Sequence, residues 1–175
     1  MTNLQLYHFN YVLNQLSKRI LPIYFYNHNK AKMCEWQNQI CLQCHVIAAY
    51  YLDKYLTSEY DITLYEGIFT DKVHNTKYNH SWLFIEKVND GFKSLGFHNY
   101  LCDIARVSAH IGLVNYDNIP SAFIEDKEHE ELRKKHNWKE LFQQNEYYTN
   151  KTGPEIIKDI DQMLIDAKLS FTQYK

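Results

Sequence analysis

Apolar residues recur at helical spacing in two segments of the first third of the chain. Over residues 3–20 they form an approximate stripe, which predicts a helix that Pro22 ends, because proline lacks the N–H that a helix interior needs. Residues 23–40 then read as irregular. From Cys41 to Leu56 the chain is apolar around most of its circumference, which predicts a buried central helix. The stripe of the first segment consists of Leu4, Leu6, Phe9, Val12, Leu13, Leu16 and Ile20.

The middle of the chain has the alternation of β-strands. Residues 61–69 alternate between apolar and polar positions, and residues 81–88 and 100–107 form two further strand-like segments. Residues 70–78 are polar and predict a loop, whereas Asn89-Asp90-Gly91 predicts a tight turn. Because the connections are short, we expect neighbouring strands to pair antiparallel.

The last third returns to helical patterns. Residues 123–146 and 154–168 predict two helices, and the second begins at Gly153-Pro154, where proline suits the first helical turn. The whole pattern predicts the α+β class, in which a central buried helix packs on an antiparallel sheet flanked by N- and C-terminal helices. The length of 175 residues favours a single domain over residues 1–175, with a helical C-terminal extension at about 120–170.

Composition removes several classes of function. Hydrophobic residues make up 45% and the formal net charge is -2, so the chain is globular and lacks a general basic field for nucleic acid. The basic run Arg133-Lys134-Lys135 lies among glutamates and reads as a solvated helix face. No apolar stretch approaches the ~18 residues of a membrane span. Without a recognisable signal peptide, the expected location is the cytoplasm with reduced thiols, or export as an effector without a cleaved signal.

Three residues carry the most informative chemistry. Cys41 opens the predicted central helix, and His80 and Asp103 lie in the second and third predicted strands. A helix N-terminus and a nearby imidazole both favour the nucleophilic thiolate, and an acid on the far side of the imidazole fixes its orientation. This order predicts a Cys-His-Asp triad. Gln37 and Gln39, just before the thiol, are candidates to stabilise an oxyanion together with the Cys41 N–H.

The segment around Cys41 permits other interpretations. Cys41-Leu42-Gln43-Cys44-His45 matches the C-x-x-C-H pattern of covalent haem attachment, and the same residues suit a redox pair or part of a zinc site. Cys44 is also an alternative nucleophile, because thiols three residues apart on a helix point to similar faces. Cys34 and Cys102 are expected to be small buried hydrophobes, and His45 shows no partner at informative spacing. We favour Cys41 as the nucleophile and expect no metal or cofactor.

These residues resemble the transglutaminase-like branch of the papain-like cysteine enzymes. Cys41 at the head of a helix, His80-Ser81-Trp82 on one strand and Asp103 on the next follow the order of that superfamily over about residues 36–107. Cys41-Leu42-Gln43, with Leu52 later on the helix, is similar to the nucleophile helix of arylamine N-acetyltransferases and of the leader proteases that mature lasso peptides. Gly67 fits the same pattern. Ile104-Ala105 stands where many members have proline after the acid, so the resemblance identifies a superfamily rather than a subfamily.

The resemblance implies a hydrolase or acyltransferase that acts through its thiol on an amide or thioester, with a peptide or protein as substrate. Trp82 is then expected to be both core and a wall of the cleft. Members of the superfamily include inactive scaffolds, so fold alone does not choose the reaction. The alternative function is therefore a non-enzymatic interaction module, whose binding surface would be the charged helix at 123–146.

Overall fold

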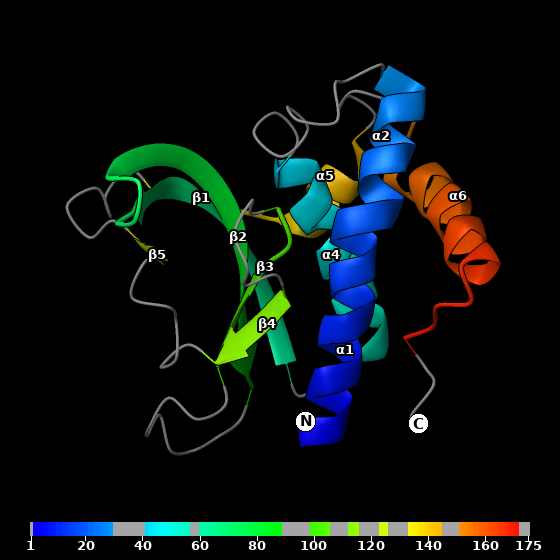
Figure 1. Cartoon of the computed structure of the whole chain (residues 1–175), viewed down its shortest axis with the longest axis horizontal. Coiled ribbons are helices and arrows are strands. Elements are labelled where there is room, and N and C mark those ends of the chain that lie inside the picture. The colour runs from blue at the N-terminus through cyan, green and yellow to red at the C-terminus, as the bar shows by residue number, and fades with distance from the viewer. Residues whose placement is uncertain are drawn as a thin grey trace.

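The computed structural model describes residues 2–29, 41–56, 60–88, 99–105, 112–115, 123–125, 133–144 and 151–171. It confirms the α+β class with an antiparallel sheet and several helices (Figure 1). A long, curved hairpin dominates the sheet, and the helices gather on one side of it. Within the described ranges, no helix is long and apolar enough to cross a membrane.

The sheet is built around the hairpin of β1 and β2, which pair along their full lengths and place Gly67 opposite His80. β3 pairs with β2 only from Leu83 to Ile85, and β4 pairs with β3. The other edge of β1 carries β6 and β5, so the order is β4-β3-β2-β1-β5 with β6 also on β1. The strands are β1 (Tyr60–Asp71), β2 (Thr76–Lys87), β3 (Tyr100–Asp103), β4 (Gly112–Asn115), β5 (Phe123–Glu125) and β6 (Lys134–His136).

The three strands predicted from alternation are present with different ends. The loop expected at 70–78 is a turn of residues 72–75 between two strands that extend into the polar segment, because pairing along the hairpin satisfies the backbone of both. The third strand ends at Asp103, and Ile104 and Ala105 have left the sheet. The turn expected at Asn89-Asp90-Gly91 lies outside the described residues.

The N-terminal helix does not end at Pro22. A segment of π-helix, η1, follows α1 and leads directly into α2, where Pro22 is the second residue. Pro22 therefore lies within a continuous helical run, and the wide π turn that precedes it accommodates the proline. The helices are α1 (Asn3–Gln15), η1 (Leu16–Ile20), α2 (Leu21–Asn29), α4 (Cys41–Tyr55), α5 (Trp138–Gln143) and α6 (Gly153–Asp166).

The long helix expected at 123–146 is wrong, and the extension at about 120–170 contains strands as well as helices. The described part of that range contains β5, β6 and the short helix α5. Arg133 lies over the ring of Tyr65 on β1, and Lys134 and Lys135 are exposed positions of an edge strand. A strand of three residues is too short to show a period of its own, so its charged residues were assigned to a helix face.

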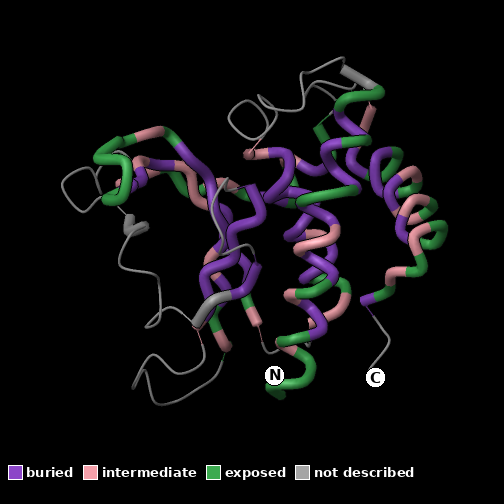
Figure 2. Tube along the Cα trace, viewed as in Figure 1, coloured by how far each residue is buried: buried purple, intermediate pink, exposed green. Residues whose placement is uncertain are grey.

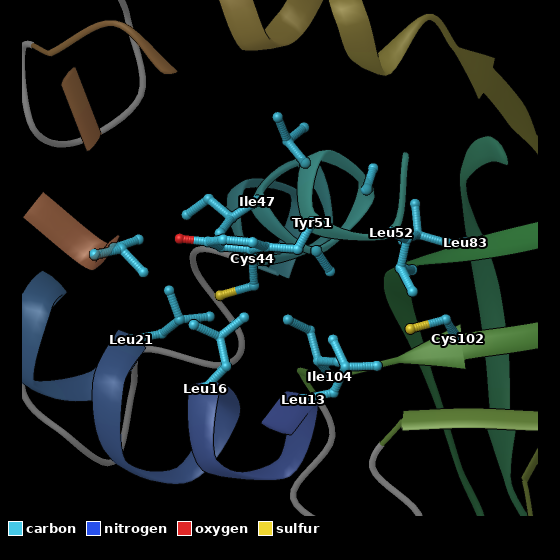
Figure 3. Packing of buried hydrophobic residues seen from close by; sticks show 14 of the residues in the cluster. Leu13, Leu16, Leu21, Cys44, Ile47, Tyr51, Leu52, Leu83, Cys102 and Ile104 are labelled. Carbon is cyan, nitrogen blue, oxygen red and sulfur yellow. The ribbon is translucent and has the colours of Figure 1, made fainter. Parts of the chain in front are cut away.

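The elements α1, η1 and α2 form one continuous helical rod at the N-terminus. The core lies between the sheet and this rod, with α4 as its centre (Figure 2). As expected, α4 is buried over most of its length, from Gln43 to Ala49 and again at Tyr51 and Leu52. Side chains of the rod, such as Leu16 and Leu21, face the interior side of α4 (Figure 3). A smaller cluster of Phe69, Trp82 and Leu101 covers another part of the sheet.

Asn10 fastens α1 to the outer strand β4. Its amide nitrogen donates to the carbonyl oxygen of Leu113 at 2.9 Å, and its amide oxygen accepts from the N–H of the same residue at 2.6 Å. The neighbouring Gly112 has a φ of 122° and no room for a Cβ, which would lie 2.5 Å from the Asn10 oxygen. One side chain thus satisfies both backbone groups of a strand residue that is 2% exposed.

Asn10→Ala should lower the free energy of unfolding by about 1–3 kcal/mol, because it leaves two backbone groups of Leu113 without their partner. Urea unfolding of the purified chain measures the change. Asn14→Ala, one turn along α1, removes the same kind of side chain without the contact to β4 and serves as the control. Equal midpoints for the two variants would contradict this account of the docking of α1.

Candidate active site

Cys41 is the first residue of α4 and is partly exposed. The N–H of a first helical residue has no partner within its own helix, and the positive end of the helix dipole lies there. Both features favour a negative charge on a side chain at this position. The local sequence thus provides part of the stabilisation of a thiolate before any tertiary contact forms.

The fold brings Cys41, His80 and Asp103 together in the predicted order. The thiol of Cys41 is hydrogen-bonded to the His80 ring. Nε2 of His80 lies 2.8 Å from Oδ2 of Asp103, which leaves Nδ1 as the ring nitrogen for the thiol. His80 is 4% exposed and Asp103 is 1% exposed, so the carboxylate acts on the imidazole with little screening by water.

The electrostatics of the three groups favour an ion pair of thiolate and imidazolium. Burial alone would lower the pKa of His80, but the charge and the hydrogen bond of Asp103 outweigh it and raise the pKa to about 9. Burial alone would raise the pKa of Cys41, but the hydrogen bond and charge of His80 lower it below its ordinary value, with help from Ser81. The proton that leaves the thiol is thus held on the imidazole.

The thiol lies near the edge of β2, beyond the point where β3 stops pairing with it. The ladder between the two strands ends at Leu83 and Cys102. Both the hydroxyl and the backbone N–H of Ser81 are hydrogen-bonded to the Cys41 sulfur. Neighbouring residues of a strand point to opposite faces, so a sulfur that contacts both His80 and Ser81 must lie by the strand edge. The early end of β3 therefore opens the space that the nucleophile occupies.

A second buried histidine belongs to the same group of residues. His45 lies one helical turn after Cys41 and is 0% exposed. Its Nδ1 is 2.7 Å from the Cys41 carbonyl oxygen and 3.0 Å from Oγ of Ser81. Its Nε2 accepts the N–H of Ile104 at 3.1 Å and lies 3.3 Å from Oδ1 of Asp103. Burial lowers the pKa of His45 and the charge of Asp103 only partly offsets it, so the ring is neutral.

The backbone after β3 is held by side chains instead of by a neighbouring strand. The N–H of Ile104 donates to His45, and its carbonyl oxygen accepts from the hydroxyl of Ser17 in η1. The N–H of Ala105 donates to Oδ1 of Asp103 at 3.1 Å. These bonds provide partners for the backbone groups of the two residues that follow β3, and they fix the carboxylate that faces His80.

The other two cysteines among the described residues, Cys44 and Cys102, are core residues. Cys44 is 0% exposed and its sulfur points into the apolar packing toward Leu16 and Leu21 (Figure 3). Burial raises its pKa well above the ordinary value, and the charges of Cys41 and Asp103 add to the effect. Cys102 is also 0% exposed. The geometry favours Cys41 over Cys44 as the nucleophile.

The C-x-x-C-H pentad contributes residues to both the core and the site. Cys44 is enclosed in the core, and both ring nitrogens of His45 already have protein partners. Among the described residues, no cluster of three or more His, Cys, Asp or Glu side chains is arranged to hold a metal ion. The spacing of the pentad thus reflects two site positions, Cys41 and His45, and one core position, Cys44, on a single helix.

Trp82 and Gly67, which the sequence also singled out, lie against each other on the hairpin. Trp82 is 2% exposed and packs on Phe69 at 5.1 Å between ring centroids, so it is a core residue as expected, and its role as a wall of the cleft stays a prediction. Phe69 in turn lies edge-on to His80 at 5.8 Å, through which the tryptophan supports the site. Gly67 leaves room for the Trp82 ring, which lies 3.0 Å from where a Cβ would be. Cys34, Gln37 and Gln39 lie outside the described residues.

Sequence reasoning missed His45, Ser81 and Ser17. The signal for His45 was its spacing of four from Cys41, which places both on one helix face. Ser81 follows His80 directly, but strand alternation assigns it to the opposite face, so only the open edge of β2 explains its contact with the thiol. Ser17 acts on a residue far along the chain and left no local signal.

Comparisons with protein-family models, with curated proteins and with solved structures found no significant match to this chain. The site is therefore interpreted from its own geometry.

Alkylation by iodoacetamide, followed residue by residue with peptide mass mapping, should separate the three described cysteines. Cys41 should react rapidly at pH 6, because its pKa is lowered, whereas Cys44 and Cys102 should stay unlabelled in the folded protein, because both are buried and have raised pKa values. Denatured protein, in which all three should label alike, is the control. Labelling of Cys44 at the rate of Cys41 would contradict the assignment of the nucleophile.

The ion pair also predicts how stability depends on pH. The folded pKa of His80 is about 9 against an ordinary 6.5, so its contribution is full below pH 6.5 and is lost as the pH rises to about 9. The lowered pKa of Cys41 has the opposite sign, and its contribution grows as the pH rises toward 9. Cys41→Ser removes the second contribution and keeps the part of the first that comes from Asp103.

The free energy of unfolding should therefore fall more steeply between pH 6.5 and 9 in Cys41→Ser than in the parent. Denaturant titrations at a series of pH values measure both slopes. Cys44→Ala should keep the pH profile of the parent up to about pH 8, since the thiol of Cys44 is neutral in the folded protein and ionises in the unfolded chain only closer to its ordinary pKa. The same slope in the parent and in Cys41→Ser would show that the thiol is not ionised.

Proposed function

We propose that this protein is a thiol-dependent hydrolase or acyltransferase that acts on an amide or thioester carbonyl of a peptide or protein. The observation that carries the proposal is the chain of contacts from the Cys41 thiol through His80 to the buried carboxylate of Asp103. The position of the thiol at a helix N-terminus, next to strands that supply the other two residues, supports a papain-like or transglutaminase-like core.

The first step uses the thiolate of Cys41 and the proton on His80. The sulfur attacks the carbonyl carbon and forms the C–S bond, while negative charge develops on the carbonyl oxygen. The N–H of Cys41 is positioned to donate to that oxygen, and the helix N-terminus favours its charge. When the tetrahedral intermediate collapses, the bond to the amine or thiol breaks and His80 gives its proton to the leaving group.

The second step releases the acyl group. His80, now neutral, takes a proton from water or from an acceptor amine, whose oxygen or nitrogen attacks the thioester carbon. Collapse breaks the C–S bond, which frees a carboxylic acid or a new amide and restores the thiolate and imidazolium. Asp103 keeps Nε2 of His80 occupied throughout, so that the other ring nitrogen faces the reacting atoms.

Two observations weigh against the alternative functions, which are an interaction module and a haem or zinc site. The interaction module was to bind through a charged helix at 123–146, and the described part of that range contains two strands and a short helix instead. The haem and zinc interpretations needed Cys44 and His45 as ligands, and these side chains are engaged in the core and in the site. Neither alternative gains a specific observation.

The proposal is tested by trapping the acyl-enzyme. Incubation with a chromogenic acyl thioester and with p-nitrophenyl esters should release the leaving group in a burst and leave an acyl group on the Cys41 peptide, seen by mass spectrometry. Cys41→Ala should abolish the adduct, and His80→Ala should slow acylation at pH 6–7 by about 10²–10⁴-fold, the usual worth of a general acid–base group.

Cys44→Ala is the matched control, because it removes a cysteine three residues away that is enclosed in the core, and it should acylate like the parent. An adduct that persists in Cys41→Ala, or the absence of any adduct on the folded parent with every acyl donor, would sink the proposal and favour a non-catalytic scaffold.

A further inference from the structure

We propose that His45 and Ser81 form a second hydrogen-bonded relay onto Cys41, in which the ring of His45 directs the Ser81 hydroxyl at the thiolate and at the same time holds the segment that carries Asp103. Both are positioning residues. The inference deepens the proposed function, and it is tested through the reactivity of the thiol and the tautomer of the ring rather than through turnover.

The contacts of His45 select one tautomer. Nε2 receives the N–H of Ile104, so this nitrogen must be the unprotonated one. Nδ1 lies 2.7 Å from the carbonyl oxygen of Cys41, which can only accept, so this nitrogen must carry the hydrogen. These two contacts agree. Oδ1 of Asp103 also lies 3.3 Å from Nε2, but this oxygen already accepts the N–H of Ala105 at 3.1 Å, so the backbone donor decides the state of Nε2. The opposite tautomer would place two acceptors together at Nδ1 and two donors together at Nε2.

This tautomer sets the direction of the Ser81 hydroxyl. Nδ1 of His45 also lies 3.0 Å from Oγ of Ser81, so its single hydrogen is shared between two acceptors, the Cys41 carbonyl oxygen and the serine oxygen. The serine's own hydrogen is then free to point to the Cys41 sulfur, with which the hydroxyl is hydrogen-bonded. A chain of donors therefore runs from His45 through Ser81 to the thiolate, and the Ser81 N–H adds a second donor to the same sulfur.

The other ring nitrogen of His45 supports the acid. By accepting the Ile104 N–H it fixes the residue that follows Asp103, and Ser17 fixes the carbonyl of the same residue. Ala105 then donates to one carboxylate oxygen and His80 to the other. His45 thus contacts both ends of the triad: the backbone of the nucleophile on α4 and the turn that presents the acid after β3.

The charges around His45 explain why the relay needs a neutral ring. Asp103 on β3 and His80 on β2 face it from the sheet, and Cys41 and Cys44 lie on its own helix. Asp103 already receives hydrogens from His80 and Ala105, so it does not require a second imidazolium. A proton on Nε2 of His45 would deprive the Ile104 N–H of its buried acceptor, at a cost.

A double-mutant cycle tests the relay. The second-order rate constant for iodoacetamide at Cys41 is measured against pH in the parent, in His45→Gln, in Ser81→Ala and in the double variant. Each single variant should react about 10- to 100-fold more slowly at pH 6, the worth of a hydrogen bond to a charged group. Because the part of the His45 effect that passes through the Ser81 hydroxyl is already lost in Ser81→Ala, the double variant should be slower than Ser81→Ala by less than the factor that His45→Gln shows alone.

Matched controls separate the relay from a general loss of structure. His74→Gln alters an exposed histidine that bonds Asp71 in the β1–β2 turn, and it should leave the pH profile unchanged. His45→Asn can keep a donor at the position of Nδ1 and should react faster than His45→Gln. Effects that simply multiply in the double variant, or equal rates for His45→Asn and His45→Gln, would overturn the relay.

Nitrogen-15 NMR of the imidazole rings in the unmodified protein tests the tautomer directly, even where a variant fails to fold. Between pH 6 and 9, His45 should show a protonated Nδ1 and a bare Nε2, whereas protonation at Nε2 would refute the proposal. An unreactive Cys41 in the parent together with the expected tautomer would count against the proposed function alone, so the two failures are distinguishable.

Discussion

The site depends on a single buried charge. Asp103 is 1% exposed, and an ionised carboxylate at that depth is costly unless hydrogen bonds and an opposite charge compensate it. His80 and the Ala105 N–H supply this compensation, one at each oxygen. In return the carboxylate raises the pKa of His80, and the imidazolium lowers the pKa of Cys41. The carboxylate thus acts on the thiol of Cys41, the proposed nucleophile, through the imidazole.

The place of the site follows from where β3 leaves the sheet. Had β3 continued to pair with β2, the Ser81 N–H would face a strand, and no sulfur could approach the edge. Departure from the sheet leaves the Ile104 backbone without a ladder, and an unpaired buried peptide group is unfavourable. His45 from α4 and Ser17 from η1 satisfy it. The helix α4, which begins with Cys41, and the π-helical turn η1 therefore both bond to Ile104.

The sequence predicts the parts of this arrangement that are written in periodic or local signals. The apolar circumference of α4, the alternation of β1 and β2, and the order of Cys41, His80 and Asp103 are all visible without coordinates. The continuation of the N-terminal helix past Pro22 was missed, because proline usually ends a helix, whereas here a π turn precedes it. β5 and β6 were missed because three residues cannot establish a period. Both pair with β1, which lies far away in the sequence, so no local pattern marks the pairing.

The site residues that sequence reasoning missed share a physical cause. His45 and Ser81 each have a satisfactory local explanation, one as a core residue on an apolar helix and the other as a strand residue facing inward, so nothing in the local pattern asks for more. Their role arises only when α4 and β2 pack together and their polar atoms, which are excluded from water, must bond to each other. The same burial that hides polar groups from sequence analysis forces them into a network, and the acid, the thiol and both imidazoles are members of it. A buried polar residue one helical turn from a candidate nucleophile is therefore best interpreted as a member of its site, since at that position the core offers few other partners.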